Sequence, residues 1–372
     1  MLPKTQTLIV LSPGFPENEA DSTCLPLQQS LVKAIKQQHP HLNLVVIAFQ
    51  YPYKKRNYLW NGITVEAFGG KRRGKLFRLY NWAQVWQRLK QINQTDNIAG
   101  ILSFWMGECA FIGERFAKAH QLKHHCWVLG QDAKPGNRYF NRIKPDGRSL
   151  MAISDFIARS LYINYGVMPR QIVPGGIDTA MFAKYDGVRS IDILGVGSLI
   201  PLKQYHLLIE VVCRLRIYFP QIKVVLCGDG PERPRLEMMV KKLKLEKNVK
   251  LVGEVPHHEI LRLMQQSKTF LHTSNYEGLG MVCLEALYAG AKVVSLVRPM
   301  DNDIQNWHIA GNTVQMAEIV SGILRDENLM YQPVLPYKIE DIAAQVAELY
   351  LTTPATISLN LSAMELNERV AV

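Results

Sequence analysis

The sequence lacks the patterns that mark membrane, fibrous and disulfide-rich proteins. No apolar run approaches the ~18 residues that a membrane-spanning helix needs, and we find no heptads, low-complexity tract or short internal repeat. The six cysteines include no C-x-x-C pair and no Cys/His spacing of a metal site. They predict buried thiols in a reducing cytoplasm, and no bound metal ion.

What the chain does contain is the composition of a soluble globular protein. Its 372 residues are 48% hydrophobic, 20% charged and 9% aromatic, which is enough apolar material for about two domains. The first apolar stretch, residues 8–11 with their flanks, is short and ends at a Pro-Gly pair. It predicts a first buried β-strand and not a signal peptide.

The formal net charge of +11 is unevenly distributed along the chain. Residues 53–57 and 70–90 carry much of the excess of lysine and arginine. Such a basic stretch either faces an anionic partner, such as nucleic acid, anionic lipid or a phosphorylated substrate, or is the solvated face of a helix. Because no DNA- or RNA-reading motif accompanies these residues, we expect no nucleic-acid partner.

Short apolar runs alternate with segments of helical periodicity nearly throughout, which indicates βαβ units and parallel sheets. In the first half we expect strands at residues 7–12, 42–49, 63–68, 98–104, 124–130 and 149–154, and helices at about 25–38, 76–92, 108–120 and 155–165. In the second half we expect strands at 191–198, 223–230, 249–255, 269–274 and 291–297, and helices at about 203–218, 232–244, 257–266, 280–289 and 313–325. The fold class is therefore α/β, with two doubly wound, Rossmann-like domains facing a central cleft.

A Pro/Gly-rich break at residues 173–178 separates the two series of elements. We expect a first domain at residues 1–175 and a second at 176–345. Residues 346–372 either cross back to the first domain or form a loose tail. In open parallel sheets, ligands bind beyond the carboxyl ends of the strands, so the residues that carry chemistry are expected in the loops that follow the strands.

Four loops of the second half combine a strand end, a glycine turn and the start of a helix: 195–210, 226–237, 251–260 and 274–287. Glycine lets a ligand approach the backbone, and a helix N-terminus offers free N–H groups and a positive dipole end to a phosphate. Lys203 adds a full positive charge to the first of these loops. The combination predicts a pocket for a diphosphate.

Glu277 and Glu285 lie eight residues apart in the segment "HTSNYEGLGMVCLEALYAGAKVVS". Within one helix, a rise of ~1.5 Å per residue would separate their Cα atoms by roughly 12 Å. A helix that starts after Gly280 instead leaves Glu277 on the preceding loop and Glu285 on its first turns. Both then border the helix N-terminus, with Glu285 available to ribose hydroxyls and Glu277 on the side where a sugar would lie.

In order along the chain, these loops resemble those of the retaining nucleotide-sugar glycosyltransferases of the GT-B fold, glycosyltransferase family 4, group 1. The matching motifs are the E-x7-E pair, "VGSLIPLK", "GDGPERPRLE" and "NVKLVGEVPHHEI". The link at residues 154–182 and the closing segment at 339–350 match as well. The resemblance covers most of residues 150–350 and extends more loosely over 1–150.

The resemblance implies a metal-independent, retaining glycosyltransferase of the hexosyltransferase type, active in glycan biosynthesis. It would transfer a sugar from a UDP- or GDP-linked donor to a hydroxyl acceptor, a glycan or a lipid-linked sugar. By the same resemblance, Lys203 stabilises the leaving diphosphate and Glu277 contacts the transferred sugar. Glu285 holds the ribose, and Asp132 joins the catalytic group. The other donor-binding residues that it implies are Gly197, Ser198, Gly228, Gly230, Val255, Gly278, Leu279, Gly280 and Met281.

The chain departs from the family pattern at Ser198, where relatives usually have an arginine, and at Leu129, where they often have a histidine. These departures leave open a catalytically degenerate protein of the same fold that binds nucleotide sugar without turnover. A second alternative is an enzyme of the GT-B fold that catalyses a different reaction, such as a sugar phosphorylase. The acceptor-side residues expected in the first domain are Gly14, Trp105, Glu108 and Gln131. If Trp105 does not line the acceptor side, it is expected to be a core residue.

Trp82 and Trp86, with Leu79 and Leu89 close by, predict one apolar helix face. We favour packing of this face on the sheet. The alternative is that this face contacts an anionic membrane, with the protein in the cytoplasm at the inner face of that membrane. Such contact suits a lipid-linked acceptor. Basic residues that would assist such contact are Lys71, Arg72, Arg73, Lys75 and Arg78. The adjacent His257 and His258 are expected to cap a helix rather than to bind a metal.

Overall fold

The computed structural model describes residues 6–70 and 74–351, and these form two compact units. The chain passes between the units more than once, so neither unit is a single continuous segment. The first unit takes the residues up to Ala152, Leu161–Gly176 and those from Ile339 onward, and the second takes Ile153–Ser160 and Ile177–Lys338.

The predicted domain boundary at residues 175 and 176 lies beside the observed passage from Gly176 to Ile177. The second unit, however, ends at Lys338 and not at residue 345. The reason is that the last described helix packs on the first unit. Of the predicted segment 346–372, residues 352–372 lie outside the described part of the chain.

The first unit is built on an eight-stranded sheet with the order β3-β4-β2-β1-β5-β6-β7-β8. Neighbouring strands are parallel except β3 and β4, which are antiparallel. The central strands are almost wholly buried, as expected where helices cover both faces of a sheet. The strands are β1 (Gln6–Gly14), β2 (Asn43–Tyr51), β3 (Arg56–Trp60), β4 (Ile63–Ala67), β5 (Asn97–Phe104), β6 (His124–Val128), β7 (Leu150–Ala152) and β8 (Gln171–Ile172).

The second unit has a six-stranded, fully parallel sheet with the order β11-β10-β9-β12-β13-β14. This is the 3-2-1-4-5-6 order of a doubly wound nucleotide-binding sheet. The first strand, β9, therefore lies in the interior, and the chain builds outward from it in both directions. The strands are β9 (Ile191–Val196), β10 (Val224–Cys227), β11 (Val249–Gly253), β12 (Ser267–His272), β13 (Lys292–Ser295) and β14 (Trp307–Ile309).

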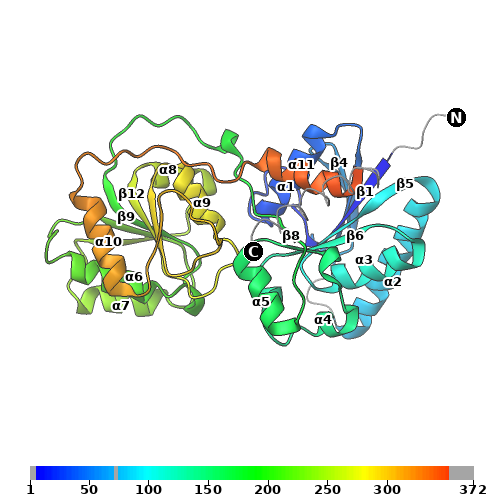
Figure 1. Ribbon diagram of the computed structural model, residues 1–372, viewed down its shortest axis with the longest axis horizontal. Coiled ribbons are helices and arrows are strands. Elements are labelled where there is room, and N and C mark those ends of the chain that lie inside the picture. Colours follow the sequence, from blue (N-terminus) through cyan, green and yellow to red (C-terminus); the bar gives the residue numbers. More distant parts are fainter. Residues whose placement is uncertain (1–5, 71–73, 352–372) are drawn as a thin grey trace, which may run out of the picture. The chain divides into compact units, whose positions relative to one another are not determined.

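Helices cover both faces of each sheet (Figure 1). In the first unit, α1 packs with α11. Helices α2 and α3 form an apolar core with side chains of the sheet. In the second unit, α6, α7 and α10 share one core, and α8 and α9 pack together on the other face. The helices are α1 (Pro26–Gln38), α2 (Lys75–Thr95), α3 (Glu108–His120), α4 (Arg138–Ile143), α5 (Asp155–Tyr165), α6 (Tyr205–Leu215), α7 (Arg233–Lys242), α8 (His257–Gln265), α9 (Met281–Tyr288), α10 (Thr313–Arg325) and α11 (Ile339–Leu351).

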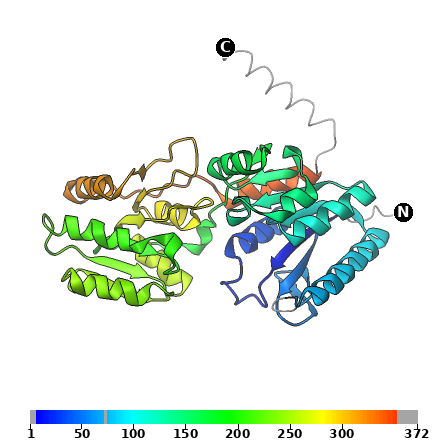
Figure 2. The same cartoon turned by 90° about the horizontal axis from the view of Figure 1, so that it is seen from below.

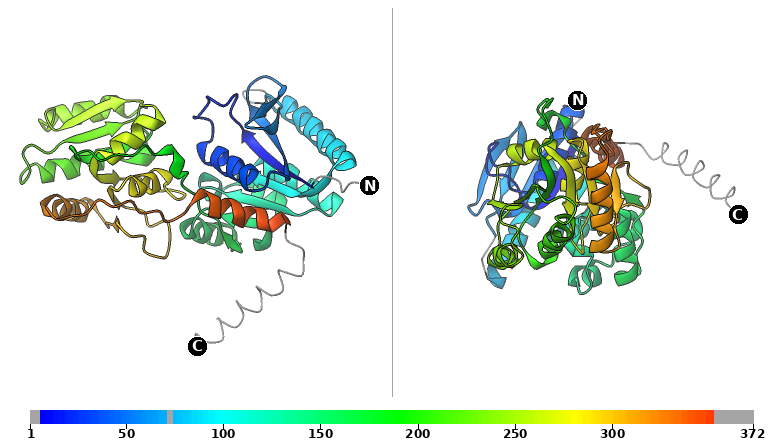
Figure 3. Two further views of the ribbon diagram at one scale, coloured as in Figure 1. Left: turned by 90° about the horizontal axis from the view of Figure 1, so that it is seen from above. Right: turned by 90° about the vertical axis from the view of Figure 1, so that its left-hand side faces the viewer.

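Helix α11 belongs to the first unit and lies beside α1 (Figure 3). The Tyr350 hydroxyl donates to the carbonyl of Ile101 at 3.2 Å, and Lys123 Nζ donates to the carbonyl of Leu349 at 2.9 Å. The Tyr350 ring fills the space over Gly100, where a Cβ atom would lie only 2.4 Å from a ring carbon. Up to Leu351, the end of the chain therefore crosses back, which was one of the two predicted alternatives.

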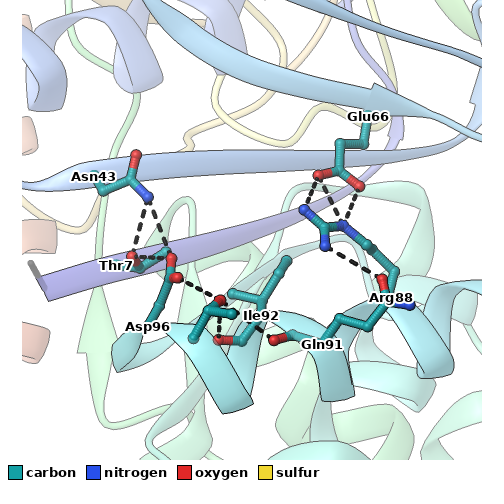
Figure 4. A network of polar contacts seen from close by, with 8 residues as sticks. Thr7, Asn43, Glu66, Arg88, Gln91, Ile92 and Asp96 are labelled. Atoms are coloured by element: carbon teal, nitrogen blue, oxygen red, sulfur yellow. Dashed lines mark hydrogen bonds and ion pairs between the residues drawn. The ribbon is translucent and has the colours of Figure 1, made fainter. Parts of the chain in front are cut away.

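Helix α2 runs beside the strands of the first unit (Figure 2) and is fixed there by polar contacts (Figure 4). Nε and Nη2 of Arg88 donate to the Glu66 carboxylate at 2.7–2.9 Å, and Glu66 is only 3% exposed. Asp96, which follows the helix, accepts from Thr7 Oγ1 at 2.8 Å. Asn43 donates to the same Thr7 oxygen at 3.1 Å.

The predicted apolar face of α2 packs on the protein. The rings of Trp82 and Trp86 lie 5.4 and 5.1 Å from aromatic rings of α3, and Leu89 is fully buried. Packing on the protein is confirmed for these residues, and membrane contact stays a prediction. Leu79 is 55% exposed and does not belong to the packed face. Three of the basic residues that the alternative invoked lie outside the described residues: Lys71, Arg72 and Arg73.

Each helix and strand expected from the periodicity is present, within a few residues of its predicted ends. The elements that the sequence did not predict are β3, β8, β14 and α4, which are between two and six residues long. The three strands lie at sheet edges, and such short runs carry no full apolar alternation. Within the part of the chain that the structure describes, no helix is both long and apolar enough to cross a bilayer.

Candidate active site

The loops that carry the predicted donor residues meet at one edge of the second unit's sheet. β9 and β12 are adjacent, but the chain between them builds β10 and β11 on the other side of β9. Loops that leave such a pair of strands lead to opposite faces of the sheet, and doubly wound sheets bind ligands at this switch point. Lys203 follows β9 and Glu277 follows β12, so both lie there.

Lys203 and Glu277 form an ion pair at the switch point, although they are 74 residues apart in the sequence. Lys203 Nζ lies 2.6 Å from Oε2 of Glu277, and Nε2 of His272 lies 3.3 Å from the same oxygen. The Lys203 side chain is 19% exposed and that of Glu277 is 24% exposed. The two loops are also joined through the backbone, because Thr273 Oγ1 donates to the Lys203 carbonyl at 2.7 Å.

The surroundings of Glu277 keep its carboxyl group ionised. Burial by itself raises the pKa of this carboxyl, but the hydrogen bond from His272 and the charge of Lys203 outweigh burial and lower the pKa to about 2. His272 is 3% exposed and also lies 3.3 Å from the hydroxyl of Ser274. At neutral pH, an anionic ligand of Lys203 must therefore compete with the Glu277 carboxylate.

Helix α9 begins where the spacing of the two glutamates requires. Its N-cap, Gly280, has φ 76°, a left-handed conformation that glycine adopts without strain. A Cβ atom at Gly280 would lie 3.5 Å from Cγ of Glu277, so the start of α9 adjoins the ion pair. Because the first turn of a helix has N–H groups without helical partners, Met281 supplies its amide at this place. The prediction that Glu277 precedes the helix and Glu285 lies within it is confirmed.

Two other predicted donor residues near α9, Gly278 and Leu279, are buried. The carbonyl of Gly278 accepts a hydrogen bond from the buried Ser154 hydroxyl. The side chain of Leu279 is 2% exposed and packs in the core. Val255 is partly exposed in the loop that follows β11. Contact of these three residues with a donor stays a prediction.

Glu285 faces His257, the first residue of α8. Nε2 of His257 lies 2.9 Å from Oε1 of Glu285. The hydrogen bond to Glu285 raises the pKa of His257, against the opposing effect of burial. The N-cap of α8 is Pro256, so the predicted capping role is wrong for His257, whose side chain turns toward α9. His258 is exposed at the surface.

The glycines of the first two loops of this unit allow the loops to pack on each other. A Cβ atom at Gly228 would lie 2.0 Å from the carbonyl oxygen of Gly197, and one at Gly230 would lie 2.6 Å from that of Leu199. Both positions also have positive φ, 132° and 153°. The sequence predicted these glycines for close approach to a ligand. The observed close approach is between backbones, and contact of these glycines with a donor stays a prediction.

Asp132, predicted as catalytic, braces a loop of the first unit. Its carboxylate accepts hydrogen bonds from the amides of Met106, Leu129 and Gly130 at 2.8–3.2 Å. Burial raises the pKa of Asp132, and these amides act in the opposite direction. Asn137 extends the brace by donating to the Met106 carbonyl at 2.8 Å. A direct contact of Asp132 with substrate stays a prediction.

Trp105 and Glu108, two of the predicted acceptor-side residues, line a pocket of about 230 Å³ in the first unit. Trp105 directly follows β5 and has φ 64°, a backbone strain that non-glycine residues show most often at functional sites. Glu108 starts α3 and accepts from Gln50 Nε2 at 2.5 Å and Trp82 Nε1 at 2.7 Å.

The other two predicted acceptor-side residues do not line this pocket. Gly14 is buried against Tyr51 and Cys24, with Tyr51 Cβ 3.3 Å from the place of a Cβ atom at Gly14. Gln131 is exposed on the loop that Asp132 braces. The structure therefore brings together only part of the predicted acceptor-side set.

A comparison with family models identifies the unit that contains the ion pair. Residues 182–315 match the family described as glycosyl transferases group 1. This part of the chain is therefore similar to group 1 glycosyl transferases. The matched segment contains Lys203, Glu277 and Glu285, so the geometry above belongs to the region that carries the family resemblance.

Curated relatives match part of the chain. One of them, from Arabidopsis thaliana, is part of a phosphatidylinositol N-acetylglucosaminyltransferase and is 32% identical over 153 residues. The match covers 39% of this chain and 34% of that protein. The chain thus spans about a third of the length of this relative.

Solved structures match nearly the whole chain and show that it has the GT-B fold. Anabaena HepE, solved with UDP and glucose, has a TM-score of 0.62 and 18% identity over 96% of this chain and 99% of that chain. Sucrose-phosphate synthase of Thermosynechococcus elongatus has a TM-score of 0.67 and 14% identity over 99% of this chain and 100% of that chain.

The family pattern usually has an arginine at the position of Ser198, in the same loop as Lys203. Among the described residues, Lys203 is the lysine or arginine that forms an ion pair with Glu277. Ser198 is exposed in the loop after β9 and carries no charge. Arg233, at the start of α7, lies 2.9 Å from Glu237 and 3.7 Å from Asp229. Its guanidinium is thus engaged on its own helix and the preceding turn.

The sequence did not assign to these sites several residues that the structure brings there. His272 ends β12 beside Glu277, and a polar side chain at a strand's carboxyl end was the available signal. Gln50 likewise ends β2, but Arg78 lies on α2, and no periodicity predicted that it would line the Trp105 pocket. Residues 6–70 and 74–351 contain no group of three or more His, Cys, Asp or Glu side chains placed to hold a metal ion.

Proposed function

We propose that the protein is a glycosyltransferase that moves a sugar from a nucleoside diphosphate sugar to a hydroxyl acceptor. The proposal includes retention of the anomeric configuration and independence of a metal ion. The observation that carries it is the Lys203–Glu277 ion pair beside the N-terminus of α9. We propose a UDP- or GDP-linked donor; the UDP-linked form is supported by Anabaena HepE, which shares the fold and was solved with UDP.

A diphosphate at the switch point would meet the Lys203 ammonium group and the first amides of α9. As the bond to the sugar breaks, negative charge builds up on the leaving diphosphate, and a fixed cation with aligned N–H groups stabilises that charge. Lys203 must then exchange its 2.6 Å contact with Glu277 for the diphosphate. Glu277 becomes free to accept a hydrogen bond from the sugar.

Glu285 is proposed to accept hydrogen bonds from the ribose hydroxyls, and its present partner supports this role. His257 occupies one carboxylate oxygen, Oε1, at 2.9 Å. A carboxylate has four lone-pair positions on its two oxygens, so a diol can bind beside His257. The hydrogen bond to His257 also fixes the side chain that the ribose would meet.

Metal independence and retention rest on the residues of the site. We assign the neutralisation of the diphosphate to Lys203 and the dipole of α9, the task that a divalent cation performs in other transferases. The glycosyl centre then passes through an oxocarbenium-like state. For retention we propose that the acceptor hydroxyl attacks from the face that the diphosphate leaves, with the diphosphate accepting the hydroxyl proton.

The test is a panel of UDP-, GDP- and ADP-sugars, with release of nucleoside diphosphate as the readout, in the presence and absence of EDTA. We expect slow hydrolysis of one donor, unaffected by EDTA, with the anomeric configuration of the first product followed by NMR. Lys203→Met should lower the rate about 10²–10³-fold, because it removes a charge that acts on the leaving group. An EDTA-sensitive rate, or an inverted product, would contradict the corresponding part of the proposal.

A matched control for Lys203→Met is Lys247→Met, which removes an exposed lysine outside the site. The control should keep the full rate. If both variants lose the same activity, the effect belongs to the net charge of the protein and the role of Lys203 is refuted.

The alternative is a catalytically degenerate protein that binds nucleotide sugar without turnover. The uncharged Ser198 and the mutual neutralisation of Lys203 and Glu277 favour it, because they leave little free positive charge for a leaving group. Tight UDP binding without turnover of any donor, even with a membrane extract as the source of acceptor, would support this alternative.

We further propose a cytoplasmic protein that acts on a glycan or lipid-linked acceptor and touches an anionic membrane peripherally. The start of α2 carries exposed apolar side chains: Leu76 is 85% exposed and Tyr80 is 57% exposed. Exposed apolar residues in a chain with a net charge of +11 suit an anionic bilayer surface. Co-sedimentation with phosphatidylglycerol vesicles but not with phosphatidylcholine vesicles, lost in Leu76→Ser, is the expected result. Equal sedimentation with both would refute membrane contact.

A further inference from the structure

The pocket of the first unit lies at the switch point of its own sheet. β1 has β2 on one side and β5 on the other, and the pocket opens beyond the ends of these three strands. Its volume of about 230 Å³ is below the ~300–1,000 Å³ of sites that enclose whole ligands. It therefore has room for one end of a molecule. The residues used below are Gln50, Arg78, Trp105, Glu108 and Tyr139.

Arg78 brings an unpaired cation to this pocket. Among the described residues it has no ion-pair partner, and its Nε atom is buried without a hydrogen-bond acceptor. Its guanidinium carbon lies 5.5 Å from the centre of the Trp82 ring, so the side chain is held over an aromatic face. The charge of Arg78 is therefore not neutralised by a described carboxylate, and the side chain lines the pocket.

More positive charge lies near Tyr139, which lines the pocket. The guanidinium carbons of Arg138 and Arg142 lie 5.9 and 6.0 Å from the ring centre of Tyr139. Neither arginine has an ion-pair partner in the part of the chain that the structure describes. Burial raises the pKa of Tyr139, and the charges of Arg78, Arg138 and Arg142 oppose that effect. Glu108 supplies the negative charge on the other side.

Glu108 is fixed as a hydrogen-bond acceptor. Gln50 and Trp82 each donate to a different oxygen of its carboxylate, at 2.5 and 2.7 Å. Each oxygen retains a lone pair for a further donor. The pocket thus presents a held carboxylate to a hydroxyl group and an unsatisfied guanidinium to an anion.

We infer that this pocket binds an acceptor that carries a phosphate close to a hydroxyl group. The phosphate contacts the guanidinium of Arg78, in the field of Arg138 and Arg142, and the hydroxyl donates to Glu108. Trp105, which directly follows β5, also lines the pocket. This inference rests on the proposed function, since it specifies the acceptor of that reaction, and it favours phosphorylated polyols over neutral glycans.

The experiment compares one polyol ring with and without a phosphate. Binding of myo-inositol 1-phosphate and of myo-inositol is measured by isothermal titration calorimetry, with UDP present at saturation to occupy the donor site. We expect the phosphate ester to bind at least about tenfold more tightly than the neutral ring, as a charge-assisted hydrogen bond provides. Vesicles of phosphatidylcholine with and without phosphatidylinositol form a second arm. Preference for the free ester indicates a soluble phosphate, and preference for the vesicle indicates a lipid headgroup.

Arg78→Gln should abolish the preference for the phosphate ester, and Arg78→Lys should restore part of it, because lysine keeps the charge without the planar fork. The matched control is Arg115→Gln on α3. Arg115 is also unpaired among the described residues and lies 4.5 Å from the ring centre of Phe111, but it does not line the pocket. UDP affinity and the melting temperature should be unchanged in all three variants, which verifies that both units remain folded.

The inference is overturned if wild-type protein binds the two rings equally, or if Arg115→Gln loses as much affinity as Arg78→Gln. The result is separable from that of the donor assay. Absence of donor turnover together with selective binding of the phosphate ester would refute the proposed function and leave the phosphate site intact. Turnover that proceeds equally well on neutral and phosphorylated acceptors would support the proposed function and refute the phosphate site.

Discussion

Replacing Glu277 by glutamine tests the electrostatics of the candidate active site directly. The variant keeps the shape of the side chain and removes the charge that Lys203 meets at 2.6 Å. The pKa of the Glu277 carboxyl falls from an ordinary 4.5 to about 2 in the folded protein. At about 1.36 kcal/mol per pKa unit, this corresponds to roughly 3 kcal/mol of stability at neutral pH.

The sign of the pH dependence follows from the direction of the shift. A carboxyl whose pKa is lowered on folding stabilises the protein above its unfolded pKa, and this stabilisation disappears as the pH falls through the folded value. The difference in stability between wild type and Glu277→Gln should therefore be largest above pH 4.5 and should narrow toward pH 2. Urea unfolding at a series of pH values measures it.

Glu318→Gln is the control, because Glu318 is an exposed glutamate on α10, outside the site. It should match wild type throughout the pH series. A gap between wild type and Glu277→Gln that stays constant with pH would refute the reasoning, since the loss would then come from packing. In ligand binding, Glu277→Gln should bind UDP at least as tightly as wild type, because Lys203 no longer has a competing anion. UDP binding that is weakened as much as in Lys203→Met would contradict the competition.

Two further predictions concern other contacts. Gly100→Ala should destabilise the first unit by about 1–3 kcal/mol, because the new Cβ would lie 2.4 Å from the Tyr350 ring. Gly322→Ala, in open space on α10, should be neutral or stabilising by up to about 1 kcal/mol. Equal melting temperatures for the two variants would refute the close packing of α11. His257→Gln should lower the melting temperature near pH 6 more than near pH 9, because the raised pKa of His257 makes its bond to Glu285 stabilising at low pH and lost as pH rises. A loss that is greater at the higher pH would contradict this sign.

Much of the fold could be predicted from the sequence because each element carries its own signal. A buried parallel strand is a short apolar run, and an amphipathic helix repeats its apolar residues every three to four positions. α3, α5 and α10 were predicted to the residue, at 108–120, 155–165 and 313–325. β3, β8 and β14 were missed because an edge strand of two to five residues has no run long enough to recognise.

The candidate site could be predicted where spacing alone fixes position. Gly280 ends the loop and starts α9, so the separation of Glu277 and Glu285 already placed one before the helix and one within it. The partners of these glutamates were not predictable in this way. His272 reaches Glu277, and His257 reaches Glu285, only because β12 and α8 are folded against α9.

By itself, the sequence determined the order of strands and helices, the change from one α/β unit to the next, and which loops carry glycine and charge. These properties depend on neighbours within a few residues. Tertiary structure decided that α11 packs on the first unit, that Asp132 braces a loop, and that Arg78 faces a pocket without a partner. Those outcomes depend on which distant segments become adjacent, and adjacency sets the burial and hydrogen bonding from which a side chain takes its charge state and its role.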